Sequence, residues 1–332
     1  MSYHTECHKT ENRLPVAQQR PQWTAPVSAL SPVRYGRVLR QVLGLCSRMR
    51  FRKAAALTLR LTANPLLSLR WFRFLNDFAI RYQLSQPHDD LMRKAIPNFF
   101  HYRASPRERL NLLQNHFILA GQVMAVDDLH QLWKGGQINC ATVQGKRETY
   151  EILLHLSDHA GARHEGAFTI SLSRCRDQAL LCMLSFIFVS GHDASHESCV
   201  TVAIGGLQGA SGDGAKRAMI DATRDLHGLR PKDAMLLIAE GIARERGAEH
   251  FLAVGNANHV INFRSNMRRR RMVSDLDRYW IERGGQPCTR FGFALQLRNQ
   301  EFPQEATQRD LCKSAFLLTG KRMVIAVRAA VT

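Results

Sequence analysis

The segment that joins two predicted helices, LHGLRPKD at residues 226–233, gathers side chains that bind anions. Arg230 and Lys232 flank Pro231, which suits the first position of a helix. Cations are unfavourable there, because the free amides of the first turn already carry partial positive charge. A bound phosphate would contact both cations and those amides. The alternative is an ordinary helix start, in which Asp233 and solvent offset the two cations.

A glycine-rich stretch, GGLQGASGDG at residues 205–214, follows an apolar run and is expected to form a loop. Its glycines would let the backbone approach a phosphate closely. The stretch matches neither the P-loop nor the dinucleotide-binding fingerprint. A flexible turn is therefore the alternative to a phosphate site.

Two residues are candidates for a general base. Glu165 begins the predicted strand EGAFTISL, and His227 lies just before the anion-binding segment. His192 and His196 have H-x-x-x-H spacing, but they fall in a predicted hairpin loop and H-E-x-x-H is absent. Because a metal site needs convergent ligands, no metal is expected, although the role of these two histidines stays open.

The net charge of +18 is concentrated near the N-terminus, where residues 12–76 hold 12 Lys and Arg and no acidic residue. This block indicates an anionic partner, which could be a phosphate-bearing ligand, an anionic lipid or a nucleic acid. Residues 33–61 form a predicted basic amphipathic helix, which could lie on an anionic membrane or pack on the protein itself. The alternative is a solvated basic surface.

No segment is expected to cross a membrane. The longest strongly apolar stretch, residues 179–189, is shorter than the roughly 20 residues that a spanning helix needs. The N-terminus lacks the apolar run of a secretory signal, and the 8 cysteines form no C-x-x-C pair. We expect a cytoplasmic protein and leave open a peripheral place at the inner membrane.

The hydrophobic periodicity predicts an α+β fold in which a helical N-terminal region precedes a mostly antiparallel sheet with a helical crossover. Residues 1–31 are expected to be disordered, and residues 32–135 to be basic and mainly helical, with a capping box at Ser105 and Glu108. In residues 145–300, four apolar or alternating runs predict an antiparallel meander. The glycine-rich loop, two helices and a parallel strand follow it. Residues 301–332 are a C-terminal tail.

Several stretches together resemble the VirK/YbjX family of Gram-negative bacteria, over roughly residues 64–295. They include HYRASPRERL, HEGAFTISLS and AVGNANHV, and the most specific are IGGLQG and LHGLRPKD. Members of that family are associated with virulence and with envelope or antimicrobial-peptide stress. The resemblance implies a bacterial protein but names no reaction.

The predicted order of elements also resembles the GNAT-type acyltransferases, whose loop and helix N-terminus hold the pyrophosphate of an acyl-coenzyme A. This likeness implies an acyl-CoA-dependent N- or O-acyltransferase, with Glu165 or His227 as general base. The additional helix at residues 215–226 leaves open which helix would cap the phosphate. The residues expected to hold the phosphates are Gln208, Gly209, Gly212, Gly214, Arg230 and Lys232.

Two functions from different classes follow. The first is an acyltransferase-like enzyme that acts on an amine or hydroxyl of an envelope component or protein, in envelope- or virulence-related processes. The alternative is a non-enzymatic basic protein that binds a polyanion, either nucleic acid or anionic lipid, in virulence-gene expression or envelope stress.

Overall fold

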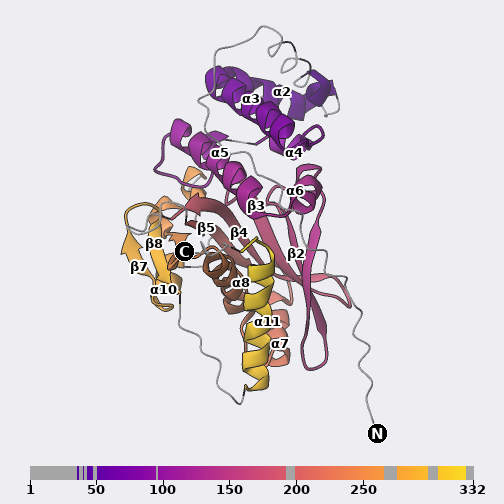
Figure 1. Ribbon diagram of the computed structural model, residues 1–332, viewed down its shortest axis with the longest axis vertical. Helices are drawn as coiled ribbons and strands as arrows, with labels where there is room; N and C mark the ends of the chain where they lie inside the picture. Colours follow the sequence, from indigo (N-terminus) through magenta and orange to yellow (C-terminus); the bar gives the residue numbers. More distant parts are fainter. Residues whose placement is uncertain are drawn as a thin grey trace, which may run out of the picture.

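The computed structural model describes residues 36, 40, 43–47, 51–94, 96–191, 199–264, 275–297 and 306–326. Three predictions fall wholly or partly outside the described residues. They concern the segment expected to be disordered, the first part of the basic amphipathic helix (most of residues 33–50), and His192 with His196. Within the described ranges, a mixed sheet lies between two layers of helices, so the fold is α+β as predicted (Figure 1).

The sheet has eight strands in the order β1-β2-β3-β4-β5-β6-β8-β7. They are β1 (Ile138–Gln144), β2 (Thr149–Leu156), β3 (Phe168–Arg174), β4 (Ala179–Ser190), β5 (Val200–Gly209), β6 (His250–Val254), β7 (Gln286–Cys288) and β8 (Gly292–Gln296). Every neighbouring pair is antiparallel except β5 and β6, which are parallel. The predicted meander, β2 to β5, and the parallel pair are confirmed, whereas β1 was not predicted.

The central strands are covered on both faces, which explains their continuous apolar runs. Strand β5 is buried from its first residue through Leu207. The segment with the longest apolar run, β4, is buried over most of its length. The long apolar run of β4 therefore belongs to the interior of the sheet and not to a membrane-spanning segment. Among the described helices, none is long and apolar enough to cross a membrane.

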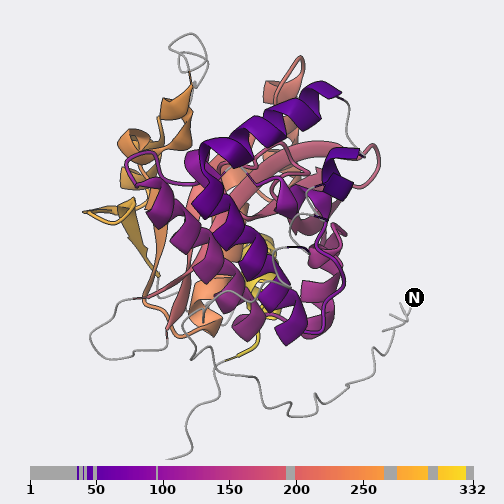
Figure 2. The same ribbon diagram turned by 90° about the horizontal axis from the view of Figure 1, so that it is seen from above.

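One layer of helices comes from the N-terminal region and lies across the sheet (Figure 2). It consists of α2 (Phe51–Ala63), α3 (Pro65–Arg81), α4 (Asp89–Met92), the 3₁₀ turn η1 (Ile96–Asn98), α5 (Pro106–Val123) and α6 (Val126–Trp133). Helix α5 lies against β4, and its predicted capping box is confirmed by bonds in both directions between Ser105 and Glu108. Helix α5 continues to Val123, and Gly121 within it makes room for the ring of Tyr82, which a Cβ there would strike.

The other layer contains α7 (Ala215–Asp225), α8 (Pro231–Glu245) and α11 (Gln308–Arg322). The short elements η2 (Asn256–Asn258), η3 (Val260–Phe263) and α10 (Leu276–Ile281) follow β6. No element was predicted within residues 301–332, yet α11 packs along α8 and buries Phe316 completely. Two glycines allow this approach. A Cβ on Gly241 would collide with the Leu317 carbonyl oxygen, and one on Gly320 with that of Ile238.

The contact between α8 and α11 generates a stability prediction. We expect Gly241→Ala to lower the free energy of unfolding by about 1–3 kcal/mol, since the added methyl forces two backbones apart. Alanine normally favours a helix over glycine, so the sign of the change is diagnostic. Urea denaturation followed by circular dichroism measures it.

The matched control is Gly44→Ala, because nothing lies within 4 Å of a Cβ at that helical position. We expect this variant to be as stable as the parent or slightly more stable. If Gly241→Ala behaved in the same way, the close packing of α8 on α11 would be wrong.

Candidate functional site

The connection between β2 and β3, residues 157–167, carries Glu165 onto the face of the sheet that α5 covers. Its ends are joined by a hydrogen bond from the Ser157 amide to the Ala167 carbonyl, at 3.0 Å. Near its end the chain lies directly on β4, since a Cβ on Gly166 would come within 2.6 Å of the Phe186 amide nitrogen. Glu165 therefore sits just beyond β4, over β5.

A β-bulge in β5 receives Glu165. Ser185 of β4 pairs with Gly206, but the next residue of β4 pairs with Ile204, so Gly205 is the extra residue. A Cβ on Gly205 would collide with the backbone carbonyl of Glu165, and one on Gly206 with its carboxylate. The prediction that these two glycines belong to a loop is wrong. They lie within a strand and make room for a carboxylate.

The Glu165 carboxylate contacts two polar side chains. Gln208 donates a hydrogen bond from Nε2 to Oε2 at 2.7 Å, and Nε2 of His259 lies 3.9 Å from Oε1. The Glu165 side chain is 16% exposed, and that of His259 is 6% exposed. Burial raises the pKa of Glu165 to about 7, although the Gln208 hydrogen bond acts in the opposite direction. A carboxyl with this pKa can accept and return a proton near neutral pH.

His259 presents a neutral imidazole to this carboxylate. Its Nδ1 accepts a hydrogen bond from the Ile261 amide at 3.1 Å, which leaves the proton of the neutral ring on Nε2, facing Glu165. Burial lowers the pKa of His259 to about 4, and a backbone hydrogen bond with Gly205 opposes this shift. His259 therefore lies beside the carboxylate as a neutral ring that adds no charge, and its separation of 3.9 Å from Oε1 is too long for a hydrogen bond.

Two further buried polar atoms have no hydrogen-bond partner among the described residues. They are Oδ1 of Asn258 and Nε2 of His101. The two residues belong to adjoining segments, because the amide of Tyr102 donates to the Asn258 carbonyl at 2.7 Å. Buried polar atoms are seldom left unpaired, so such atoms indicate a place for a ligand or water. Sequence reasoning assigned no role to His259, Asn258 or His101, although all three lie in the family-like stretches AVGNANHV and HYRASPRERL.

The predicted phosphate-binding residues are divided by the sheet. Successive strand residues face opposite sides, so Gly209 faces away from Gln208 and Glu165. Lys232 is on the Gly209 side, since a Cβ on Gly209 would lie 3.4 Å from its Cε. The structure thus pairs Gln208 with Glu165 on one face and Gly209 with Lys232 on the other.

Strand β5 extends past its parallel partner. In the described chain, β5 pairs with β6 only through Ala203 and Ile204. No strand in the described ranges covers that edge of β5 from Gly206 to Gly209. This edge is uncovered only in the sense that no described strand pairs with it, since β5 is buried through Leu207, and it lies between the two groups of candidate residues.

Gly212 and Gly214 form the actual loop, between β5 and α7. Their φ angles are +92° and +79°, a left-handed backbone that favours glycine. Gly214 occupies the N-cap position of α7, and nothing lies within 4 Å of a Cβ at either glycine.

Arg230 occupies the N-cap of α8 and is exposed. Its side chain makes no hydrogen bond or ion pair with another described residue, and it lines a groove of about 370 Å³ between α8, α10 and α11. Asp233 also lines this groove, where Arg283 binds it at 2.6 Å and the Tyr279 hydroxyl at 3.2 Å. Asp233 thus complements the helix N-terminus, as the alternative interpretation expected, while Arg230 remains available to an anion.

His227 does not join Glu165. It lies in the turn after α7 with φ +54°, next to Asp225. Asp225 accepts hydrogen bonds from the Arg147 amide and the Tyr150 hydroxyl, at the start of β2. Glu165 follows the opposite end of β2. The two predicted bases therefore belong to different places in the fold, and Glu165 has the chemically distinctive surroundings.

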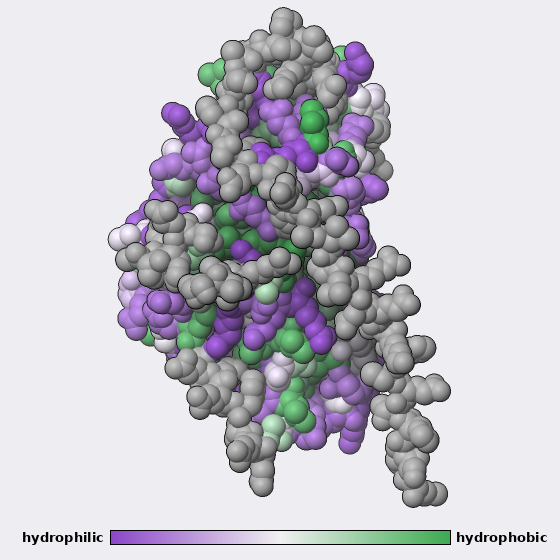
Figure 3. Space-filling model, in the orientation of Figure 1, coloured by the Kyte–Doolittle hydropathy of each residue, from purple (hydrophilic) through white to green (hydrophobic). Residues whose placement is uncertain are grey.

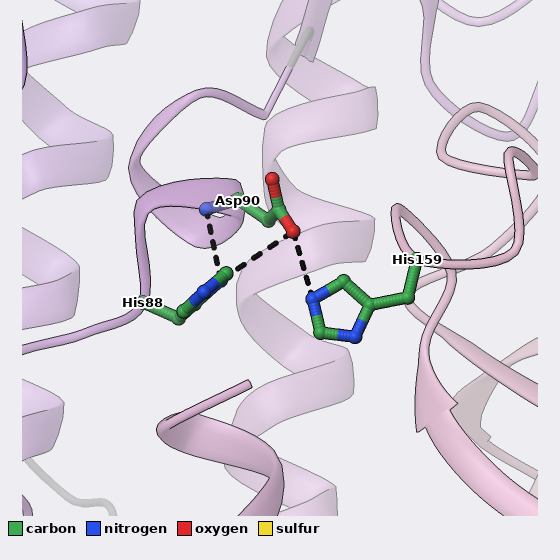
Figure 4. A group of neighbouring side chains, drawn as sticks. All are labelled: His88, Asp90 and His159. Atoms are coloured by element: carbon green, nitrogen blue, oxygen red, sulfur yellow. Dashed lines mark hydrogen bonds and ion pairs between the residues drawn. The ribbon is translucent and has the colours of Figure 1, made fainter. Parts of the chain in front are cut away.

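A second polar cluster lies at the beginning of the β2–β3 connection. There His159 contacts Asp90, which also lies beside His88 (Figure 4). Sequence reasoning did not identify this cluster, because its members come from segments about seventy residues apart.

Comparison with known proteins identifies the family. Residues 47–312 match the family described as "Protein of unknown function (DUF535)". The chain belongs to the DUF535 family. It is also similar to the "Uncharacterized protein YbjX" of Escherichia coli (strain K12), with 24% identity over 228 residues, which cover 68% of this chain and 67% of the relative. No solved structure gives a significant match. These matches agree with the YbjX resemblance and name no reaction.

The pKa of Glu165 in this DUF535 protein predicts a pH-dependent stability. The folded-state pKa, about 7, is above the ordinary value of 4.5, so the folded state holds this proton more tightly than the unfolded chain does. The resulting stabilisation is present below about pH 4.5 and is lost as the pH rises through about 7. Glu165→Gln resembles the protonated form at every pH.

Urea denaturation of both proteins at pH 5 and pH 8 measures this effect. We expect the two to be similarly stable at pH 5, and the variant to exceed the parent by as much as about 3 kcal/mol at pH 8. If the difference in the free energy of unfolding between Glu165→Gln and the parent were the same at both pH values, the raised pKa of Glu165 would be contradicted.

Proposed function

We propose that this chain is an acyltransferase-like enzyme, which uses an acyl-CoA donor and acts on an amine or hydroxyl of an envelope component or protein. The observation that carries the proposal is the placement of Glu165. A carboxyl with a pKa of about 7 lies against a glycine bulge, beside an uncovered strand edge.

Glu165 is proposed as the general base. An amine or hydroxyl must lose a proton as it attacks the thioester carbonyl, and a base works best when its pKa is near the working pH. The acceptor nitrogen or oxygen forms a bond to the acyl carbon, and the carbon–sulfur bond breaks. The acceptor's proton passes to Glu165, the departing thiolate takes up one proton from solvent, and Glu165 then releases its proton to solvent and returns to the carboxylate form. The hydrogen bond from Gln208 holds the carboxylate in position, and the neutral ring of His259 lies beside it.

The donor's phosphates are proposed to bind where the loop of Gly212 and Gly214 meets the start of α7. The first turn of α7 contains no acidic residue, so its free amides favour an anion. Lys232 lies beside Gly209 at the same end of β5, and Arg230 adds an unpaired charge at the start of α8. The acyl arm would pass along the uncovered edge of β5 toward Glu165.

The order of elements supports this proposal. A meander is followed by β5, a glycine loop, helices and the parallel strand β6, which is the order that suggested the GNAT-type acyltransferases. A role in envelope- or virulence-related processes, in the cytoplasm or at the inner membrane, rests on the resemblance to the VirK/YbjX family.

Thermal unfolding with acetyl-CoA, hexanoyl-CoA and free coenzyme A tests the donor site. We expect an acyl-CoA to raise the melting temperature of the full chain, because a ligand at about 100 times its Kd adds about 2.7 kcal/mol of stability. Lys232→Ala and Arg230→Ala should reduce the shift, and Glu165→Gln should retain it.

Arg107→Ala is the matched control, since Arg107 is an exposed arginine in the first turn of α5, in the other helical layer. Its shift should equal that of the parent. The absence of a shift with every acyl-CoA at low salt would refute the donor site, as would an undiminished shift in Lys232→Ala.

A second function, binding to an anionic lipid surface, is favoured by a separate observation. Residues 12–76 contain no acidic residue, and large apolar side chains in this window are exposed. Phe51 is 86% exposed, Leu59 71% and Leu66 81%. Figure 3 shows hydrophobic residues among hydrophilic ones at the top of the molecule, where α2 and α3 lie. Cations beside exposed apolar side chains suit a lipid surface better than a nucleic acid, which needs mainly the charge.

Flotation with phosphatidylglycerol vesicles tests this second function. We expect the chain to bind phosphatidylglycerol vesicles and to bind phosphatidylcholine vesicles only weakly. The double variant Leu59→Ser, Leu66→Ser should lose most of the binding to phosphatidylglycerol vesicles. The control pair Ile281→Ser, Leu311→Ser removes similarly exposed side chains elsewhere. If both double variants lost vesicle binding to the same extent, the lipid surface would be ruled out. Tighter binding of the parent chain to duplex DNA than to vesicles would also rule it out. Substitution is preferable to deletion, because the window also contains buried core residues such as Trp71.

A further inference from the structure

Two imidazoles from different segments converge on one carboxylate oxygen (Figure 4). His88 and Asp90 flank the start of α4, and His159 lies in the β2–β3 connection. Oδ2 of Asp90 is 2.9 Å from Nε2 of His159 and 3.4 Å from Nδ1 of His88. The three atoms lie within 4.8 Å of one another.

The two separations from Oδ2 of Asp90 match the edges of a metal coordination sphere. Bonds of about 2.0–2.1 Å to nitrogen and oxygen, in tetrahedral geometry, put neighbouring ligand atoms about 3.3 Å apart. All three side chains are partly exposed, at 35% for His88, 17% for Asp90 and 23% for His159. An ion bound there would therefore keep one or more positions open to solvent or to a small molecule.

The hydrogen bonds at His88 leave a lone pair directed into the cluster. The Asp90 amide donates to Nδ1 of His88 at 3.3 Å, so Nδ1 acts as an acceptor. The same nitrogen faces the Asp90 carboxylate, which is also an acceptor. Two acceptors that face each other repel unless a cation lies between them. The other nitrogen, Nε2, is not open to a metal, since it lies against Gly135, where a Cβ would come within 2.9 Å of it.

The ligands are held in place by residues around them. Arg93 binds the other oxygen of Asp90, which leaves Oδ2 directed at the two histidines. The residue before His159, Asp158, is bound by the buried Lys94 at 2.7 Å. Such outer partners fix the orientation of metal ligands. The cluster therefore exists before any ion arrives.

We propose that His88, Asp90 and His159 bind a divalent transition-metal ion of the zinc and iron class. Two neutral imidazoles and one carboxylate form a donor set that such ions prefer and that Mg²⁺ and Ca²⁺ do not. This proposal replaces the expectation that no metal binds, which considered only histidines close together in the sequence. The site is separate from Glu165 and does not depend on the acyltransferase proposal.

Titration of the EDTA-treated full chain with Zn²⁺ in a calorimeter, and with Co²⁺ in a spectrophotometer, tests the site. We expect one binding event that His88→Ala and His159→Ala each weaken by more than the roughly 10–100-fold typical of losing an outer partner. The bound Co²⁺ should absorb in the visible range without the thiolate bands that a cysteine site would give.

His250→Ala is the matched control, because His250 is half-buried at the start of β6, away from the cluster. It should bind as the parent does. His159 lies in an exposed turn, so His159→Ala keeps the test decisive even if His88→Ala fails to fold. The proposal is overturned if His159→Ala binds Zn²⁺ as tightly as His250→Ala, or if the parent binds none.

Discussion

A buried lysine holds both candidate sites against the sheet. Nζ of Lys94 lies 2.7 Å from Asp158 and donates to the Gly166 carbonyl at 3.0 Å, and its side chain is only 2% exposed. A charge in such a place is tolerated only when it is paired, so Lys94 requires the β2–β3 connection to close over it. His159 follows Asp158 and Glu165 precedes Gly166. One buried ion pair thus fixes the segment that carries both His159, a ligand in the proposed metal site, and Glu165, the proposed general base.

The other requirement is space in the sheet. Glycines at 205 and 206 allow the chain to cross β5, and the bulge turns both toward Glu165. The same crossing buries the Glu165 carboxyl, which raises its pKa. The contact that closes this face of the sheet is therefore also the cause of the raised pKa.

Local patterns predicted the local parts of this structure. Alternating and apolar runs located β2 to β5, and Ser105 with Glu108 located the start of α5. Glu165 and Gln208 were both selected, but in different roles, as base and as phosphate ligand. Their hydrogen bond joins residues 43 positions apart and could not be read from the sequence. The glycines were interpreted as a phosphate loop, because a glycine-rich stretch looks the same in the sequence whether the space it leaves holds a ligand or a carboxylate of the same chain. The cluster of His88, Asp90 and His159 depends on tertiary folding, which no spacing shows.

The ionisation of Glu165 can be observed directly by NMR. In protein labelled with ¹³C at the glutamate carboxyl carbon, the resonance absent from Glu165→Gln identifies this residue, and its chemical shift is followed from pH 4 to pH 9. A midpoint near pH 7 is expected, as a buried carboxyl beside Gln208 and neutral His259 requires. A midpoint near the ordinary value of 4.5 would mean that Glu165 is a solvated carboxylate and not a base prepared by the fold.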